Sequence, residues 1–161
     1  MAVNIHLKID GIEGMSEVKG FEKQIQVEAW SWGMSMATNF GASTGGSAGK
    51  VNLQDLNFTH MIDKSSPKLM EACCTGKHIK DAVIVFNKAG GDAMVPFLKI
   101  TMNDVLISSV QVGGSSNDTP MANVTIAFAE YKLEYQEQDN KGAKKGGPVI
   151  SGFNVQKNAK A

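Results

Sequence analysis

The amino-acid sequence predicts one mainly β domain, a sandwich or a closed barrel, with a single helix. Three observations lead to this prediction. Apolar and polar residues alternate through most of the chain, which is typical of strands. Only one segment shows helical spacing. The length of 161 residues fits one domain, and 42% apolar with 20% charged residues is the composition of a globular protein.

The alternation predicts seven or eight strands, at residues 3–9, 24–30, 51–59, 82–88, 95–102, 105–112, 123–136 and 149–156. In the first of these, the apolar residues share one face and His6 points outward to solvent. The segment 82–88 is nearly all apolar, as expected for a strand covered on both sides. Residues 89–92 are typical of a hairpin turn between this strand and the next.

One helix is predicted over residues 65–76. Ser65 and Pro67 provide a cap and a proline in the first turn, and Gly76 stands where a C-terminal glycine belongs. The apolar residues between these ends have helical spacing, so we expect the helix to pack one side on the strands. The residues expected in this core are Leu69, Met70 and Cys73, with Cys74 as a second reduced and buried thiol.

Two segments are rich in small residues and are predicted to be long loops. The first covers residues 33–50 and contains several Gly, Ser and Thr residues. The second covers residues 138–148 and contains three Gly and three Lys residues, which predicts flexibility. Long loops inside a small domain usually serve a function or are flexible. All these segments belong to a single domain, 1–161.

Composition excludes two classes of partner. The chain has no net charge and no arginine, so it lacks both the positive field and the planar guanidinium fork that nucleic-acid binding uses. No window approaches the roughly 20 apolar residues of a membrane span, and the N-terminus has no apolar stretch typical of a signal peptide. We therefore expect no nucleic-acid or membrane partner, and synthesis and folding in the cytosol.

Three enzyme-like patterns fail on their context. The string Gly41–Gly45 matches the nucleophile elbow around Ser43, but no helix pattern follows it. The run Gly45–Lys50 resembles a phosphate-binding loop, but it lacks the first Gly and the hydroxyl after the Lys. The adjacent residues Cys73 and Cys74 cannot easily reach one metal ion together, with His60 and His78 as the other candidates. We predict no enzymatic activity, no cofactor and no metal.

The run Ala29–Trp32 carries an orientation prediction. Strand alternation places Trp30 and Trp32 on one face and Ser31 on the other. Two large aromatic side chains need burial, so Trp30 and Trp32 are predicted to lie in the core.

The sequence resembles the Hcp family, the haemolysin co-regulated proteins of type VI secretion systems. The resemblance runs nearly end to end. It begins with MAV at residues 1–3. It continues in the strings AWSWGMS (29–35), GKVNLQDL (49–56), IDKSSPKLM (62–70), CTGKH (74–78), KAGG (88–91), ISSV (107–110), GGPV (146–149) and GFNV (152–155). Each string is weak alone, but their order and spacing together are specific.

The resemblance implies an antiparallel β-barrel with one helix packed on its side, like phage tail tube proteins. It also implies hexameric rings that stack into a tube, together with a spike protein, a sheath and a baseplate. The channel would carry and chaperone small effector proteins, and the tube would leave the cytoplasm for the medium or a target cell without a signal peptide. In such a ring, Ser31 is predicted to face the channel. The residues of the predicted ring contact are Thr38, Asn39, Phe40, Gly41, Ala42, Ser43, Thr44, Gly45, Gly46 and Ser47.

Two other functions remain open at this point. One is a monomeric β-barrel that binds a small apolar ligand inside. The other is a hydrolase that uses Ser43 as its nucleophile.

Overall fold

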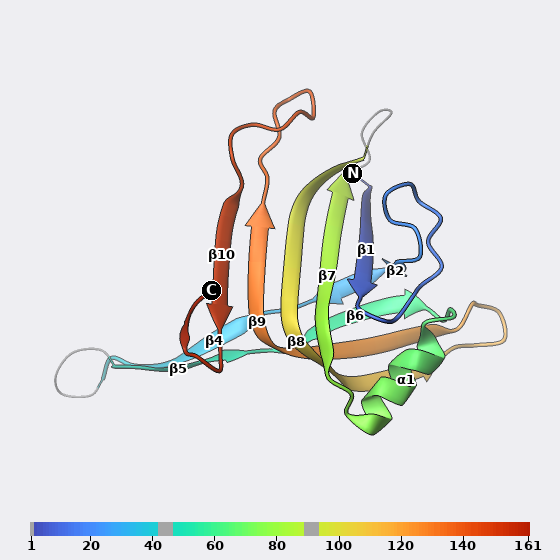
Figure 1. Cartoon of the computed structure of the whole chain (residues 1–161), viewed down its shortest axis with the longest axis horizontal. Coiled ribbons are helices and arrows are strands. Elements are labelled where there is room, and N and C mark those ends of the chain that lie inside the picture. Colours follow the sequence, from blue (N-terminus) through green and yellow to red (C-terminus); the bar gives the residue numbers. More distant parts are fainter. Residues whose placement is uncertain (1, 42–46, 89–93) are drawn as a thin grey trace.

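The computed structural model describes residues 2–41, 47–88 and 94–161 (Figure 1). This part of the chain is mainly β with one helix, as the sequence predicts. Its elements are β1 (Val3–Ile9), β2 (Ile25–Val27), β3 (Ala29–Ser31), β4 (Met34–Asn39), β5 (Ser47–Leu53), β6 (Leu56–Met61), α1 (Ser66–Thr75), β7 (Ile79–Lys88), β8 (Val95–Gly113), β9 (Met121–Tyr135), β10 (Val149–Asn154) and β11 (Ala159–Lys160).

The strand pairs within the described residues are all antiparallel, and most of them follow one another around a barrel. Strand β1 pairs with β2 and β7, β7 pairs with β8, β8 with β9, β9 with β6, and β6 with β3. Only Glu28 separates β2 from β3, and its N–H donates to the Thr59 carbonyl of β6 at 2.8 Å. The pairing therefore returns to its start. Strands β10 and β11 extend the sheet beyond β9.

A bend in β8 and β9 joins the two halves of the barrel. In Figure 1 each of these strands has an upright half and a half that crosses below it. The bend in β8 lies at Asp104, whose φ of 57° is in the left-handed region. The pairing passes from Asn103 with Glu130 to Val105 with Phe128. The two strands predicted at 95–102 and 105–112 are thus one strand, because the ladder resumes directly after the bend.

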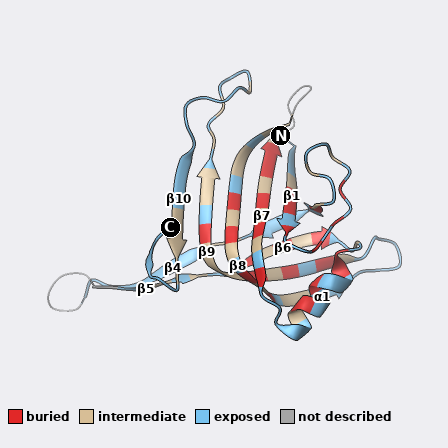
Figure 2. Cartoon of the chain, viewed as in Figure 1, coloured by how far each residue is buried: buried red, intermediate tan, exposed pale blue. Residues whose placement is uncertain are grey.

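Apolar side chains from both halves fill the interior of the barrel. Figure 2 shows the buried residues concentrated on β7, β8, β9 and one side of α1. Burying each such side chain contributes about 1.5–3 kcal/mol to the free energy of unfolding. The largest fully buried side chains of the interior are Phe58, Leu7, Ile25, Leu56, Leu69, Ile84, Ile100, Met102, Ile126, His60 and Val105.

The helix is confirmed to within one residue at each end. It ends at Gly76, which has a φ of 63° and takes the left-handed conformation that glycine adopts without strain. Ser66, Leu69 and Ala72 are buried, so the covered stripe repeats every three residues. Leu69 is confirmed as a core residue, and Cys73 is half-buried against the core.

The core prediction is wrong for Met70 and Cys74. Met70 is 43% exposed and Cys74 is also exposed. Met70 follows Leu69 of the covered stripe, and Cys74 follows Cys73 at the edge of that stripe. A step of one residue turns the side chain about 100° around the helix. They therefore lie on the side of α1 that faces away from the strands.

The prediction that His6 is solvated is also wrong. Its side chain does alternate away from the barrel interior, but it is only 2% exposed. The segment between β1 and β2 folds over this face, and the Phe21 ring stacks on the imidazole at 4.8 Å between centroids. Burial lowers the pKa of His6 below its usual value.

The segment 33–50 is not a long loop in its described part. It contains β4 and β5, which form an antiparallel ribbon with Met34 opposite Leu53 and Met36 opposite Val51. The strand predicted at 51–59 is divided accordingly, because Gln54 and Asp55 separate β5 from β6. The predicted turn at 89–92 lies outside the described residues.

The segment predicted as a Gly/Lys loop, 138–148, does connect two strands, β9 and β10. A carboxylate organises part of it: Asp139 Oδ1 accepts hydrogen bonds from the N–H groups of Lys141 and Ala143, at 2.8 and 2.9 Å. Among the described residues, no helix has both the length and the apolar character needed to cross a lipid bilayer.

Candidate functional site

One outer face of the barrel consists of small, neutral side chains. Residues directly opposite each other on antiparallel strands point to the same side of a sheet. Ser31, Asn57, Thr125 and Ser109 form one such row across β3, β6, β9 and β8, and a parallel row lies two residues away. We call these eight residues the uncharged wall: Ala29, Ser31, Asn57, Thr59, Ser109, Gln111, Asn123 and Thr125.

The uncharged wall lies on a rigid support. Between and beside its rows, the same strands turn Phe58, Val124 and Ile126 inward, and all three are fully buried. Hydroxyl groups on the wall are also linked to each other, since Ser109 Oγ and Thr125 Oγ1 are 2.6 Å apart. The wall therefore presents hydrogen-bonding groups and no formal charge on a fixed surface.

The outer face of the upright half has a different character. There the corresponding rows contain Lys8, Lys99, Lys132 and Glu134. Glu134 lies 3.9 Å from Lys99 Nζ and 3.5 Å from Lys132 Nζ. Charged side chains thus gather on this face, whereas the eight positions of the uncharged wall carry none. The Asp55 carboxylate lies at the edge of the wall, because it accepts a hydrogen bond from Ser108 Oγ, which is 2.7 Å from Thr125 Oγ1.

Ser31 lies on the uncharged wall, and its side chain is exposed. The predicted alternation is confirmed, because Trp30 and Trp32 turn to the opposite face. Trp32 is half-buried and packs against Phe128 and Tyr131, with ring centroids 5.7 and 5.0 Å away.

The core prediction fails for Trp30. Its indole packs on Phe86 at 4.6 Å but is 37% exposed. Strand β3 has only three residues and pairs with β6 on one side. One edge of the indole is therefore left open to solvent.

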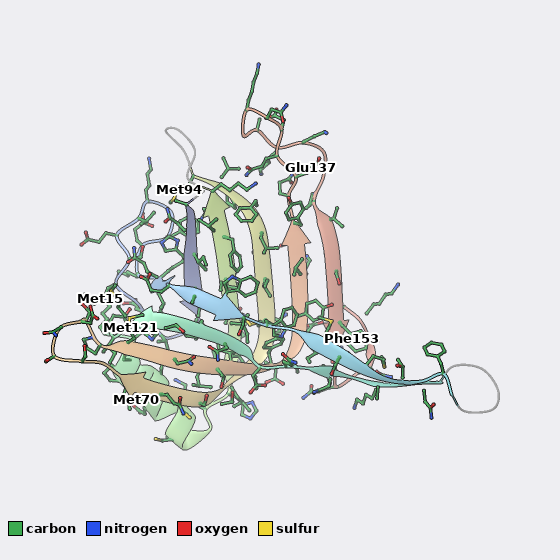
Figure 3. All side chains as sticks on the ribbon, turned by 180° about the vertical axis from the view of Figure 1, so that it is seen from behind. Met15, Met70, Met94, Met121, Glu137 and Phe153 are labelled. Atoms are coloured by element: carbon green, nitrogen blue, oxygen red, sulfur yellow. The ribbon has the colours of Figure 1, made fainter. Side chains whose placement is uncertain are left out.

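The second candidate surface is the ribbon of β4 and β5, which we call the arm. Its outer part extends beyond the other elements (Figures 1 and 3). The cross-strand pairs Met34 with Leu53 and Met36 with Val51 give it one apolar face. Met34 and Met36 are 46% and 44% exposed, and Phe40 near the tip is 82% exposed. An apolar face of this kind on a two-stranded ribbon is typical of an interaction site.

The described residues of the predicted contact segment lie at the outer end of the arm. Thr38 and Asn39 belong to β4, where Asn39 pairs with Ser47 of β5. Phe40 and Gly41 follow β4 and are exposed. Ala42, Ser43, Thr44, Gly45 and Gly46 lie outside the described residues, as does the nucleophile elbow proposed around Ser43. The part of the chain that the structure describes holds no group of three His, Cys, Asp or Glu side chains placed to bind a metal ion.

The comparison with known proteins agrees with the resemblance seen in the sequence. The family model described as "Type VI secretion system effector, Hcp" matches residues 6–135. The chain belongs to the Hcp family. It is 48% identical over 162 residues to Protein hcp1 of Pseudomonas aeruginosa, and the alignment covers all of both chains.

Solved structures of Hcp proteins have the same fold. Hcp1 from Salmonella typhimurium is 31% identical and covers all of both chains, with a TM-score of 0.80. A type VI secretion system effector from Yersinia pestis is 32% identical, covers 94% of this chain and 99% of its own, and has a TM-score of 0.77. A structure described as a type six secretion system protein reaches 0.93 at 27% identity, over 99% and 100% of the two chains. This Hcp protein is therefore a type VI secretion system tube or effector protein.

Sequence reasoning placed Ser31 on the face opposite both tryptophans but missed the surface around it. The other seven residues of the uncharged wall come from segments far apart in the chain, and only the strand pairing aligns them. Their alternation is visible in the sequence, but which strands become neighbours is not. The arm was missed because glycine, serine and threonine dominate its sequence and are typical of a loop. The spacing of Met34 and Met36, two residues apart, is the feature that indicates a strand with an apolar face.

Proposed function

We propose that six copies of this Hcp protein form a ring, and that the rings stack into the inner tube of a type VI secretion system. The uncharged wall faces the central channel, where small effector proteins are carried and chaperoned. The observation that carries this proposal is the wall itself, a sheet surface of eight neutral, exposed or half-buried side chains backed by the core.

A neutral surface suits a channel with varied cargo. Fixed charges would attract some effectors strongly and repel others, whereas hydroxyl and amide groups both donate and accept hydrogen bonds with many partners. Each bond is weak in net terms, about 0.5–1.5 kcal/mol, so cargo can be held and still be released.

The arm supplies a contact between copies. Its apolar face and the described residues of its outer end, 38–41 and 47, lie away from the barrel, so they meet a different surface on the next copy. Such a head-to-tail contact closes into a ring when the rotation from one copy to the next is a whole-number fraction of a full turn. A spike protein, a sheath and a baseplate complete the assembly. The tube forms in the cytoplasm and carries the protein to the medium or a target cell, and neither step uses enzymatic activity.

Native mass spectrometry of the purified protein tests the ring. We expect a species of six subunit masses. A species of one subunit mass alone would contradict the proposal and would favour the monomeric ligand-binding barrel. The described interior argues against that alternative, because side chains such as Phe58, Ile100 and Met102 fill it.

A further inference from the structure

The root of the arm contains an extra residue on one strand. In the barrel, Ser31 pairs with Asn57, and in the arm, Met34 pairs with Leu53. Two residues on one side, 32–33, therefore face three residues on the other, 54–56. This is the arrangement of a β-bulge, which bends a strand and redirects the ribbon that follows it.

The bulge decides which side chains the arm presents. Without the extra residue, the barrel register would continue and place Gln54 opposite Met34 and Asn52 opposite Met36. With it, Leu53 and Val51 occupy those positions, and the four apolar side chains share one face. The apolar face of the arm thus exists only because of the bulge.

Hydrogen bonds made by the side chains of Trp32 and Asp55, and one backbone bond, hold this bulge. Trp32 Nε1–H donates a hydrogen bond to the Gln54 carbonyl at 2.8 Å, and Gln54 N–H donates to the Gly33 carbonyl at 3.0 Å. The indole is itself fixed against Phe128 and Tyr131. The neighbouring residue Asp55 accepts a hydrogen bond from Ser108 Oγ of β8 at 2.6 Å.

We propose that Trp32 is a positioning residue, which fixes the direction of the arm so that its apolar face meets the next copy in the ring. Asp55 supports it through Ser108. A ribbon of two strands is only marginally stable by itself, so a root without these bonds would act as a hinge. The part of this inference that concerns assembly rests on the proposed function. The part in which Trp32 holds the arm concerns the single chain alone.

The variant Trp32→Phe tests this role. Phenylalanine retains an aromatic ring against Phe128 and Tyr131 but removes the N–H donor. The matched control is Trp30→Phe, which shortens a neighbouring aromatic side chain away from the bulge. Amide hydrogen exchange at Gln54 and along β4 and β5 measures how firmly the arm is held, and native mass spectrometry measures the ring fraction.

We expect Trp32→Phe to speed exchange at Gln54 on the order of tenfold, which is the effect of losing about one hydrogen bond. We also expect it to lower the ring fraction while the barrel amides stay protected. Asp55→Ala should also speed exchange at Gln54 and lower the ring fraction, because it removes the acceptor for Ser108. Asp55→Asn keeps an acceptor for Ser108 and should resemble the parent. Trp30→Phe should change neither quantity.

Unchanged exchange in both Trp32→Phe and Asp55→Ala would overturn the inference, as would faster exchange with a normal ring fraction. If the parent itself forms no rings, the proposed function fails instead. The exchange comparison would then still decide whether Trp32 holds the arm.

Discussion

His60 is a titratable residue in the middle of the core. Its side chain is fully buried, the Phe58 ring lies 5.5 Å away, and neither ring nitrogen has a hydrogen-bond partner among the described residues. Burial lowers the pKa of His60, and this effect exceeds the opposing attraction of Asp63, whose carboxylate lies 3.9 Å away. The neutral imidazole is therefore the form that the fold accommodates.

This burial predicts a pH dependence of stability. Because the pKa of His60 is lower in the folded chain than the unfolded value of 6.5, the unfolded chain binds the proton more readily. The free energy of unfolding should thus be highest above pH 6.5 and fall as the pH drops below it; His6 adds in the same direction. Urea unfolding followed by fluorescence at pH 7.5 and pH 5 measures this difference. The variant His60→Phe should reduce it, and an equal pH dependence in that variant would show that His60 is not responsible.

Leu69 and Met70 provide a matched pair on the helix. Leu69 is fully buried and Met70 is 43% exposed. Leu69→Asp would bury an unpaired charge at a cost of several kcal/mol, which is a large part of the stability of a domain, so we expect insoluble or unfolded protein. Met70→Asp should stay soluble with a melting temperature close to that of the parent. Thermal melting of both variants, followed by circular dichroism, measures this difference in stability. A soluble Leu69→Asp variant with normal melting would mean that this face of the helix is exposed.

At the scale of elements, the signals that worked were local. The helix has a proline near its start and a glycine at its end, and both act on the residues beside them. The bend at Asp104 has no such local signal. The left-handed backbone conformation of this aspartate is imposed by the corner that β8 and β9 form together. The burial of His6 was also out of reach, since it depends on a segment that folds back over the strand.

The arm can be tested as a unit. Deleting Thr38–Ser47 removes its outer end but leaves the bulge and the pairs between Met34, Met36 and their partners. Because the arm makes few contacts with the barrel, we expect the circular dichroism spectrum of a folded barrel and a loss of stacked tubes in electron micrographs. Secretion should fall as well. A deletion of 139–145, in the connection between β9 and β10, is the control for shortening a segment. Tubes as abundant as those of the parent would exclude the outer arm from the contact.

At the scale of the whole molecule, the division into a charged and an uncharged face depends on register. A slip of one residue in any of the four strands would exchange wall residues such as Asn57 for core residues such as Phe58. The alternation could be predicted from the sequence, and so could the side of Ser31 relative to both tryptophans. The pairing of β3 with β6 and of β6 with β9 could not, because these contacts join residues up to 70 positions apart, as in the pair of Leu56 with Ile126.

In the proposed ring of six copies, a single substitution on the uncharged wall is repeated six times. Ser31→Gln keeps the wall neutral but places a long side chain at six symmetric positions, where it would narrow the channel and block hydrogen bonds to cargo. Its own chain should tolerate the change, because Ser31 is exposed and lies opposite Asn57, outside the core. We expect normal melting and normal rings, but the loss of at least one co-purifying effector. Thr101→Gln is the control, since Thr101 lies on the charged face of β8 between Val83 and Lys132. Ser31→Gln rings that retain every effector as well as the parent would show that the uncharged wall does not hold the cargo. A loss of rings with a stable subunit would show instead that Ser31 is buried between copies.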